Sequence, residues 1–325
     1  MKIQPLSKIL QPFAKAFPQH LDATLRTQRI HIQIASPLML FSKHEKPLAI
    51  TSPPGKRFLI NGLPKTGTHL AKKIMHLAGM QQHPFTLAAY HADQAVISWN
   101  RKYKSTLGPA VEIGALQPKP MHDLLLREVL RSIPPLHVFN GHCTHSDALA
   151  DLLQQEEIQT IALVRDPRDV VVSLAEYLIK HEHPQYRGTS WNKCLRQAIK
   201  GYSPIHAPKV RPTEERGWQQ AWQAFLPWKE VKGVLFLRFE DLVGPEGGGS
   251  EEIQLQNIRR ILDFAGKQAL PAEEIRSDVF GGTRTFRRGG IGRWKEKFTP
   301  ENKSRFKDVI GDILVGLGYE TNTDW

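Results

Sequence analysis

Residues 58–70, which read FLINGLPKTGTHL, combine residue types and a spacing that suit a phosphate or sulfate group. An apolar run leads into a small-residue turn containing Lys65, Thr66 and Gly67, and a helix is predicted to begin at Thr68. Such a turn gathers backbone N–H groups, a helix N-terminus and an ammonium around one point. We therefore expect the ligand to be an anionic, nucleotide-like molecule.

This turn differs from a Walker A loop, in which the lysine directly follows the last glycine. Here Lys65 precedes Gly67. On its own the turn has an equally simple structural explanation, in which Pro64 and Gly67 shape the chain and Thr66 caps the helix. Two further segments favour a binding site.

The second segment, residues 161–173, reads IALVRDPRDVVVS. Arg165 ends an apolar run, so we expect it at the carboxyl end of a buried strand, where open α/β sheets bind ligands. Asp166 and Pro167 are typical of a helix start, and Ser173 falls two turns into that helix. A guanidinium and a hydroxyl so placed could grip a phosphate, although an Arg–Asp cluster capping the helix is the alternative.

The third segment, residues 285–298, reads TFRRGGIGRWKEKF. It has three glycines among five cations, which is too Gly-rich for a regular helix. A loop of this kind can surround an anion with backbone amides and guanidinium groups. Taken alone, it could equally be a basic surface loop.

Together these segments resemble the sulfotransferases that use 3′-phosphoadenosine 5′-phosphosulfate (PAPS), most closely the cytosolic type and its bacterial relatives. In that family a P-K-[ST]-G-T-[TS] loop binds the 5′-phosphosulfate, and residues 64–69 match it except at His69. The R-[ND]-x-x-D-x-x-x-S segment for the 3′-phosphate matches residues 165–173. The R-K-G-x-x-G-x-W-K segment matches residues 287–295 with arginine for lysine, and [RY]-[FY]-E-D-L matches residues 238–242.

The resemblance covers roughly residues 57–320 and implies an enzyme that moves a sulfuryl group from PAPS to a hydroxyl or amine. It implies direct in-line transfer and release of adenosine 3′,5′-bisphosphate (PAP). Because Leu70 replaces the family's tryptophan, Phe239 and Phe280 are the candidates for stacking on adenine. The other donor-binding residues implied are Lys65, Thr66, Gly67, Thr68 and His69 for the phosphosulfate, and Arg165, Ser173, Arg287, Arg288 and Gly289 for the 3′-phosphate.

Sulfuryl transfer also needs a base for the acceptor's proton and cations for the departing oxygen. The apolar stretch before residue 141 ends in GHCTH, and the family places its catalytic histidine there, at His142. Asn140 replaces a family lysine, which leaves more of the charge stabilisation to Lys65. The alternatives among the 14 histidines are His145 and His69.

The composition agrees with an anionic ligand. Lys and Arg number 44 against 32 Asp and Glu, a formal net charge of +12. Nucleic acid is not expected, because the sequence has no zinc spacing, RRM signature or helix-turn-helix pattern. No metal is required, since lysine and amides can carry the charge. Cys143 and Cys194 support no disulfide framework and fit a reducing compartment.

Strands and helices alternate along the chain, which predicts an α/β, three-layer sandwich with a central parallel sheet. The resemblance implies that this fold carries a P-loop-like phosphosulfate-binding loop. Residues 84–120 and 181–212 are predicted to be irregular, and in the family such insertions line the acceptor mouth. Strands are predicted at residues 57–61, 136–140, 160–164 and 234–238. Helices are predicted at residues 68–78, 122–132, 146–155, 167–180, 214–226, 252–264 and 300–316.

Residues 1–50 are expected to form an N-terminal arm or extension, followed by a sulfotransferase domain over residues 51–325. No apolar stretch is long enough to span a membrane and no signal-peptide core is evident, so we expect a cytoplasmic protein. Peripheral membrane contact through the basic arm is an alternative. The acceptor is expected to be a small molecule, a lipid or a glycan; the sequence specifies no oligomeric state.

Two other functions remain open. A P-loop kinase or NTPase-like phosphotransferase would bind the same phosphates, but no lysine follows the loop glycine and no clear acidic residue ends the next strand to hold Mg²⁺. A catalytically inactive nucleotide- or anion-binding homologue is favoured by Asn140, His69 and Leu70. The presence of His142 and Lys65 opposes it.

Overall fold

The computed structural model describes residues 55–89, 110–180, 188–201, 216–280 and 290–325. At its centre is a five-stranded sheet with the strand order β2-β5-β1-β6-β7. Every neighbouring pair in it is parallel. The strands are β1 (Arg57–Gly62), β2 (Gln81–Leu87), β5 (His137–Gly141), β6 (Ile158–Val164) and β7 (Leu235–Arg238).

Strand β1 is the middle of the sheet, between β5 and β6, and its apolar residues 58–60 are suited to burial on both faces. All six residues of β1 are buried. In the registers of the sheet, Asn61 of β1 is opposite Gly141 of β5, and Gly62 is opposite Leu163 of β6. The carboxyl ends of β5, β1 and β6 therefore meet at one edge, which places the segments that follow them side by side.

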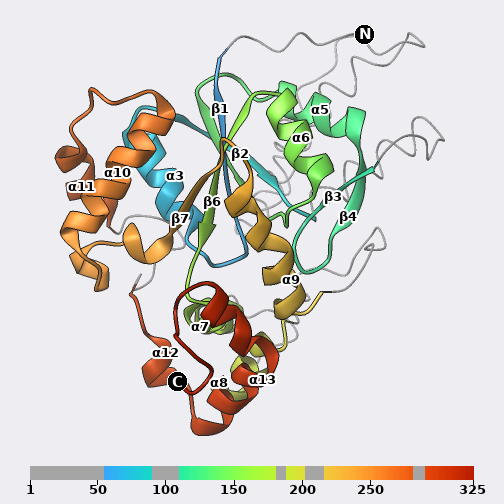
Figure 1. Ribbon diagram of the computed structural model, residues 1–325, viewed down its shortest axis with the longest axis vertical. Coiled ribbons are helices and arrows are strands. Elements are labelled where there is room, and N and C mark those ends of the chain that lie inside the picture. The colour runs from blue at the N-terminus through green and yellow to red at the C-terminus, as the bar shows by residue number, and fades with distance from the viewer. Residues whose placement is uncertain (1–54, 90–109, 181–187, 202–215, 281–289) are drawn as a thin grey trace, which may run out of the picture. The chain divides into compact units, whose positions relative to one another are not determined.

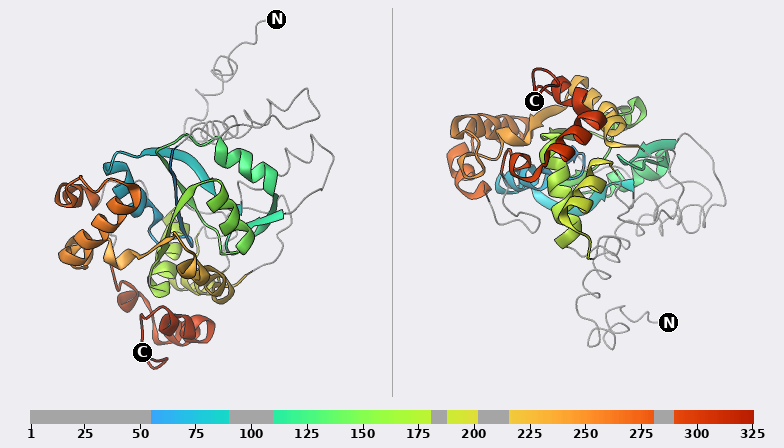
Figure 2. Two further views of the ribbon diagram at one scale, coloured as in Figure 1. Left: turned by 45° about the horizontal axis from the view of Figure 1, so that its top comes forward. Right: turned by 90° about the horizontal axis from the view of Figure 1, so that it is seen from below.

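Helices cover both faces of the sheet. Figure 1 shows α3, α10 and α11 on one side and α5 and α6 on the other, while α7, α8, α12 and α13 gather beyond one end, as Figure 2 also shows. The helices are α3 (Thr68–Leu77), α5 (Asp123–Arg131), α6 (Asp147–Gln155), α7 (Pro167–Lys180), α8 (Trp191–Ile199), α9 (Trp218–Phe225), α10 (Glu251–Ala265), α11 (Ala272–Val279), α12 (Trp294–Lys297) and α13 (Pro300–Gly316). Short 3-10 helices occupy η1 (Leu226–Glu230), η2 (Phe239–Asp241) and η3 (Pro245–Gly247).

This arrangement confirms the predicted three-layer α/β sandwich with a parallel central sheet. The core lies between the sheet and the layer formed by α3, α10 and α11, and it is made of aliphatic side chains such as Ile60, Ile74 and Ile261. Asp166 caps α7 as predicted, because its Oδ1 accepts a hydrogen bond of 2.9 Å from the backbone N–H of Arg168.

Two segments predicted to be irregular contain regular structure. Residues 84–120 include part of the edge strand β2 and the antiparallel pair β3 (Ala110–Ile113) and β4 (Lys119–His122). Residues 181–212 include α8. The prediction missed β2 because Pro84 and several exposed polar residues are untypical of a buried strand. An edge strand tolerates both. The pairing of β2 with β5 also shifts register between Gln82 and Thr86.

Residues 1–54 lie outside the described part of the chain, so the predicted N-terminal arm and the domain boundary at residue 51 stay predictions. Within the described ranges, none of the helices is both long enough and apolar enough to cross a membrane.

Candidate functional site

The turn between β1 and α3 is closed by Thr66. Its hydroxyl donates a hydrogen bond of 2.8 Å to the carbonyl of Leu63, and its backbone N–H donates to the same oxygen at 3.2 Å. Lys65 and Gly67 both have positive φ, at 73° and 98°. In the part of the chain that the structure describes, the N–H groups of Gly67, Thr68 and His69 have no acceptor. These amides are therefore available to an anion.

The ring of Phe239 packs so closely against the turn that residue 67 has no room for a side chain. A Cβ at residue 67 would lie 2.4 Å from the Cδ2 of Phe239, far inside contact distance. Gly79, at the other end of α3, also has positive φ, at 90°, but a Cβ there would meet nothing within 4 Å. The two glycines thus share a backbone conformation and differ in their surroundings.

Gly67→Ala should therefore destabilise the protein more than Gly79→Ala does. Both substitutions force alanine into the left-handed region, at about 1–2 kcal/mol. Only the first also overpacks the site against Phe239, which adds about 1–3 kcal/mol. Chemical denaturation of the two variants measures the difference; equal free energies of unfolding would mean that the ring moves aside without cost.

His142 directly follows β5, and the end of β1 orients its ring. Its Nδ1 lies 2.7 Å from the carbonyl oxygen of Gly62, which can only accept, so Nδ1 carries the hydrogen and donates it. The neutral ring then has its lone pair on Nε2, as a general base needs. Burial lowers the pKa of His142; the Gly62 hydrogen bond opposes this, and the Lys65 ammonium adds to it.

The backbone on either side of His142 is held by the sheet. The side-chain amide of Asn61, fully buried in β1, donates to the carbonyl of Cys143 and accepts from its N–H, both at 2.9 Å. The N–H of His142 donates to the carbonyl of Leu87 at 2.8 Å. Strands β1 and β2 together fix the position of the imidazole before any ligand binds.

Arg165 joins the β1–α3 turn to the Gly-rich segment. Its guanidinium donates to the carbonyl of Lys65 at 3.3 Å and to the carbonyl of Gly290 at 3.1 Å. It stacks on Phe239 with 4.3 Å between its Cζ and the ring centre, and the residue is only 6% exposed. Burial lowers the pKa of Arg165, whereas Asp169 and Glu240 favour its charged form.

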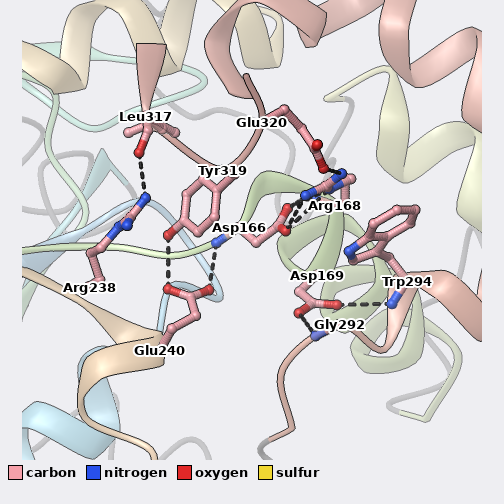
Figure 3. A network of polar contacts seen from close by, with 10 residues as sticks. All are labelled: Asp166, Arg168, Asp169, Arg238, Glu240, Gly292, Trp294, Leu317, Tyr319 and Glu320. Carbon is pink, nitrogen blue, oxygen red and sulfur yellow. Dashed lines mark hydrogen bonds and ion pairs between the residues drawn. The ribbon is translucent and has the colours of Figure 1, made fainter. Parts of the chain in front are cut away.

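The described part of the Gly-rich segment lies against α7. The carboxylate of Asp169 accepts hydrogen bonds from the N–H groups of Gly292, at 2.7 Å, and Trp294, at 3.0 Å (Figure 3). Arg293 forms an ion pair with Glu176, one helical turn beyond Ser173. The preceding candidates Arg287, Arg288 and Gly289 lie outside the described residues.

Helix α7 carries two more residues of the site. The Nζ of Lys65 lies 4.3 Å from the ring centre of Tyr177, a cation–π contact. Ser173, one turn before Tyr177, is half-buried. The segments around Lys65 and Arg165 and the described end of the third segment thus converge on α7.

The remaining candidates lie around this centre. His69 is exposed on the first turn of α3, and Phe239 is 5% exposed beneath the guanidinium of Arg165. Phe280 is half-buried against the core. His145 packs edge-on against Trp228 with ring centres 5.1 Å apart, which agrees with a structural role.

Both cysteines are buried. Burial raises the pKa of Cys143 to about 12, so its thiol stays protonated at neutral pH. Within the described ranges, no three or more His, Cys, Asp and Glu side chains come together as metal ligands.

The sequence interpretation missed several contributors to the site. Tyr177 is not among the predicted site residues, although its position one turn after Ser173 places it on the ligand side of α7. Asp169 was recognised only as a motif position, and its two backbone contacts carried no sequence signal. The carbonyl of Gly62 could not have been found, because any residue supplies the same group.

The chain is similar to known sulfotransferases. Residues 55–318 match the family model of the sulfotransferase domain. Rat sulfotransferase 2A1 is 22% identical over 283 residues, covering 78% of this chain and 83% of that protein. Human sulfotransferase 6B1 is 24% identical over 245 residues, covering 68% and 71%. The crystal structure of mouse sulfotransferase SULT7A1 complexed with PAP has a similar fold, with a TM-score of 0.52 and 17% identity over 81% of this chain and 86% of that one.

Proposed function

Because the chain belongs to the sulfotransferase domain family, we propose that it transfers a sulfuryl group from PAPS to a hydroxyl or amine acceptor. The observation that carries the proposal is the meeting of three groups where β1 ends. His142 is bonded to Gly62, the Lys65 ammonium helps to lower the pKa of His142, and Arg165 is bonded to the carbonyl of Lys65. A base, an ammonium and a guanidinium therefore share one neighbourhood, which suits a donor with a phosphosulfate at one end and a phosphate at the other.

The β1–α3 turn would hold the 5′ end of the donor. The available amides of Gly67 and Thr68 and the ammonium of Lys65 favour an anion there, while Thr66, whose hydroxyl is bonded to the carbonyl of Leu63, shapes the turn. Arg165, the hydroxyl of Ser173 and residues 287–289 would hold the 3′-phosphate. These contacts with the 3′-phosphate take no part in bond breaking, but they hold the reacting atoms of the donor in position.

His142 would accept the proton. Its Nδ1–H is committed to Gly62, so the free lone pair of Nε2 takes the hydrogen of the acceptor hydroxyl. The acceptor oxygen forms a bond to sulfur as the bond from sulfur to the 5′-phosphate oxygen breaks. The electron pair leaves with PAP, and Lys65 stabilises the charge that grows on the departing oxygen.

The same proposal includes the other expectations drawn from the sequence. The acceptor is a small molecule, a lipid or a glycan, and the protein acts in the cytoplasm. Residues 51–325 form the catalytic domain and residues 1–50 an extension of it.

Incubation with ³⁵S-labelled PAPS and fractionated cell extract tests the activity directly, and the labelled product identifies the acceptor. A thermal-shift comparison separates the proposal from phosphotransfer. PAP should raise the unfolding temperature, and ATP with Mg²⁺ should raise it much less at the same concentration. Protection by ATP with Mg²⁺ alone would favour a phosphotransferase instead.

Arg165→Ala should weaken PAP binding by about 10- to 100-fold, because charged hydrogen bonds of this kind contribute about 1.5–3 kcal/mol. Isothermal titration calorimetry measures the loss. Arg259→Ala is the matched control, since it removes one positive charge from an exposed position of α10. If both variants bind PAP equally well, Arg165 has no part in donor binding.

A further inference from the structure

Residues 319–325 lie beyond the region that matches the family model, which ends at residue 318. They nevertheless contact residues that lie next to those proposed to bind the 3′-phosphate. The hydroxyl of Tyr319 donates to one carboxylate oxygen of Glu240 at 2.8 Å, and the other accepts from the N–H of Asp166 at 2.9 Å (Figure 3). One carboxylate thus connects Tyr319 to the residue that follows Arg165.

A second connection runs through Arg168. This residue is 3% exposed, and its guanidinium pairs with Asp166 at 2.8 Å and with Glu320 (Figure 3). Its Cζ lies 4.0 Å from the ring centre of Trp294 and 4.6 Å from that of Trp325. The guanidinium is therefore enclosed by two carboxylates and two indoles.

These contacts depend on one another. Burial raises the pKa of Tyr319, and the Glu240 carboxylate raises it further, so the phenol keeps the proton that it donates. The guanidinium of Arg238 stacks on the face of the Tyr319 ring, with 4.4 Å between its Cζ and the ring centre, and so helps to hold the ring in place. A buried charge is stable only while its partners remain, so removing Glu320 would leave Arg168 short of one counter-charge.

Both connections end on the residues beside the 3′-phosphate site. Asp166 follows Arg165 in the chain, and Trp294 shares the carboxylate of Asp169 with Gly292. The N–H groups of Tyr319 and Glu320 donate to the carbonyl of Leu314 in the preceding helix α13. The side chains of these two residues reach Glu240 and Arg168, and through them Asp166. None of these contacts is made to the β1–α3 turn within the described ranges.

We propose that residues 319–325 act as a strap that positions Arg165 and the described residues 290–294 beside the 3′-phosphate, with Tyr319 and Glu320 as positioning residues. The inference rests on the proposed function, since it assigns a task within the same donor site. The strap touches no substrate. It lowers the cost of ordering the groups that do, which is how pre-organisation strengthens binding.

The test compares two ligands that differ only in the 3′-phosphate, PAP and adenosine 5′-monophosphate. In Glu320→Gln and Tyr319→Phe, calorimetry should show a loss of about tenfold or more in PAP affinity, the loss of a charged hydrogen bond. The affinity for adenosine 5′-monophosphate should stay unchanged, so the preference for PAP falls. With PAPS as the donor, its KM should rise while kcat stays near the wild-type value.

Glu273→Gln is the matched control, because it removes an exposed ion pair with Arg259 that lies on α10 and α11. It should bind both nucleotides like the wild type. Variants that keep the full preference for PAP would overturn the strap while leaving the proposed function intact. Variants that lose both ligands equally, with a lower unfolding temperature, would overturn it in favour of a general structural role. A wild-type protein without preference for PAP would overturn the proposed function itself.

Discussion

His142→Ala should lower kcat by about 10²- to 10⁴-fold, the contribution of a well-placed general base. PAP binding should remain, because His142 contacts the carbonyl of Gly62 and does not support the turn that would hold the donor. Steady-state turnover with PAPS and calorimetry with PAP measure the two quantities separately. Sulfuryl transfer at the normal rate would show that another group accepts the proton.

His145→Gln is the matched control, since it alters the neighbouring histidine, which packs on Trp228. It should keep most of the activity. The pH profile of the wild type gives a second measure. A lowered pKa leaves His142 unprotonated at pH values where a histidine of the usual value, 6.5, would already be charged. The plot of kcat/KM should therefore stay level down to that value and fall only below it.

Lys65→Ala should lower kcat by about 10²- to 10³-fold, the effect of removing one donor that stabilises a departing oxygen. Asn140, 5% exposed beside His142, brings no positive charge, so the structure offers no second cation from that position. The loss should appear mainly in kcat, because the amides of the turn and Arg165 still bind the donor.

Lys65→Arg and Lys193→Ala control for charge. The first keeps a cation at the turn and should recover part of the rate; the second removes an exposed lysine from α8 and should leave the rate unchanged. Single-turnover measurements with saturating PAPS separate chemistry from product release. An unchanged rate of chemistry in Lys65→Ala would remove Lys65 from the mechanism.

The elements that position the site were predictable because their signals are local. Residues 57–62 form an apolar run ended by a turn with Pro and Gly, and Asp166 with Pro167 starts a helix at the predicted residue. Arg165 could be placed at a strand end for the same reason. The resemblance of four ordered motifs then indicated the family.

The contacts that complete the site are not local, and the sequence carries little information about them. Glu240 accepts a hydrogen bond from Tyr319, which lies 79 positions later in the chain. Arg165 donates a hydrogen bond to Gly290, 125 positions later. Such pairs depend on how the layers pack. Strand β2 was missed because an edge strand needs no continuous apolar pattern, and its contact with His142, through Leu87, was missed with it.

The double hydrogen bond of Asn61 has a wider consequence for this enzyme. The Asn61 amide bonds to both backbone groups of Cys143, and the carbonyl of Gly62 accepts from the imidazole of His142. The orientation of this proposed base is therefore set by the pairing of strands β1 and β5. Central strands open only when the whole sheet does. The proposed base is thus aligned by the most cooperative part of the molecule, so we expect its ring to keep the same orientation when a donor binds.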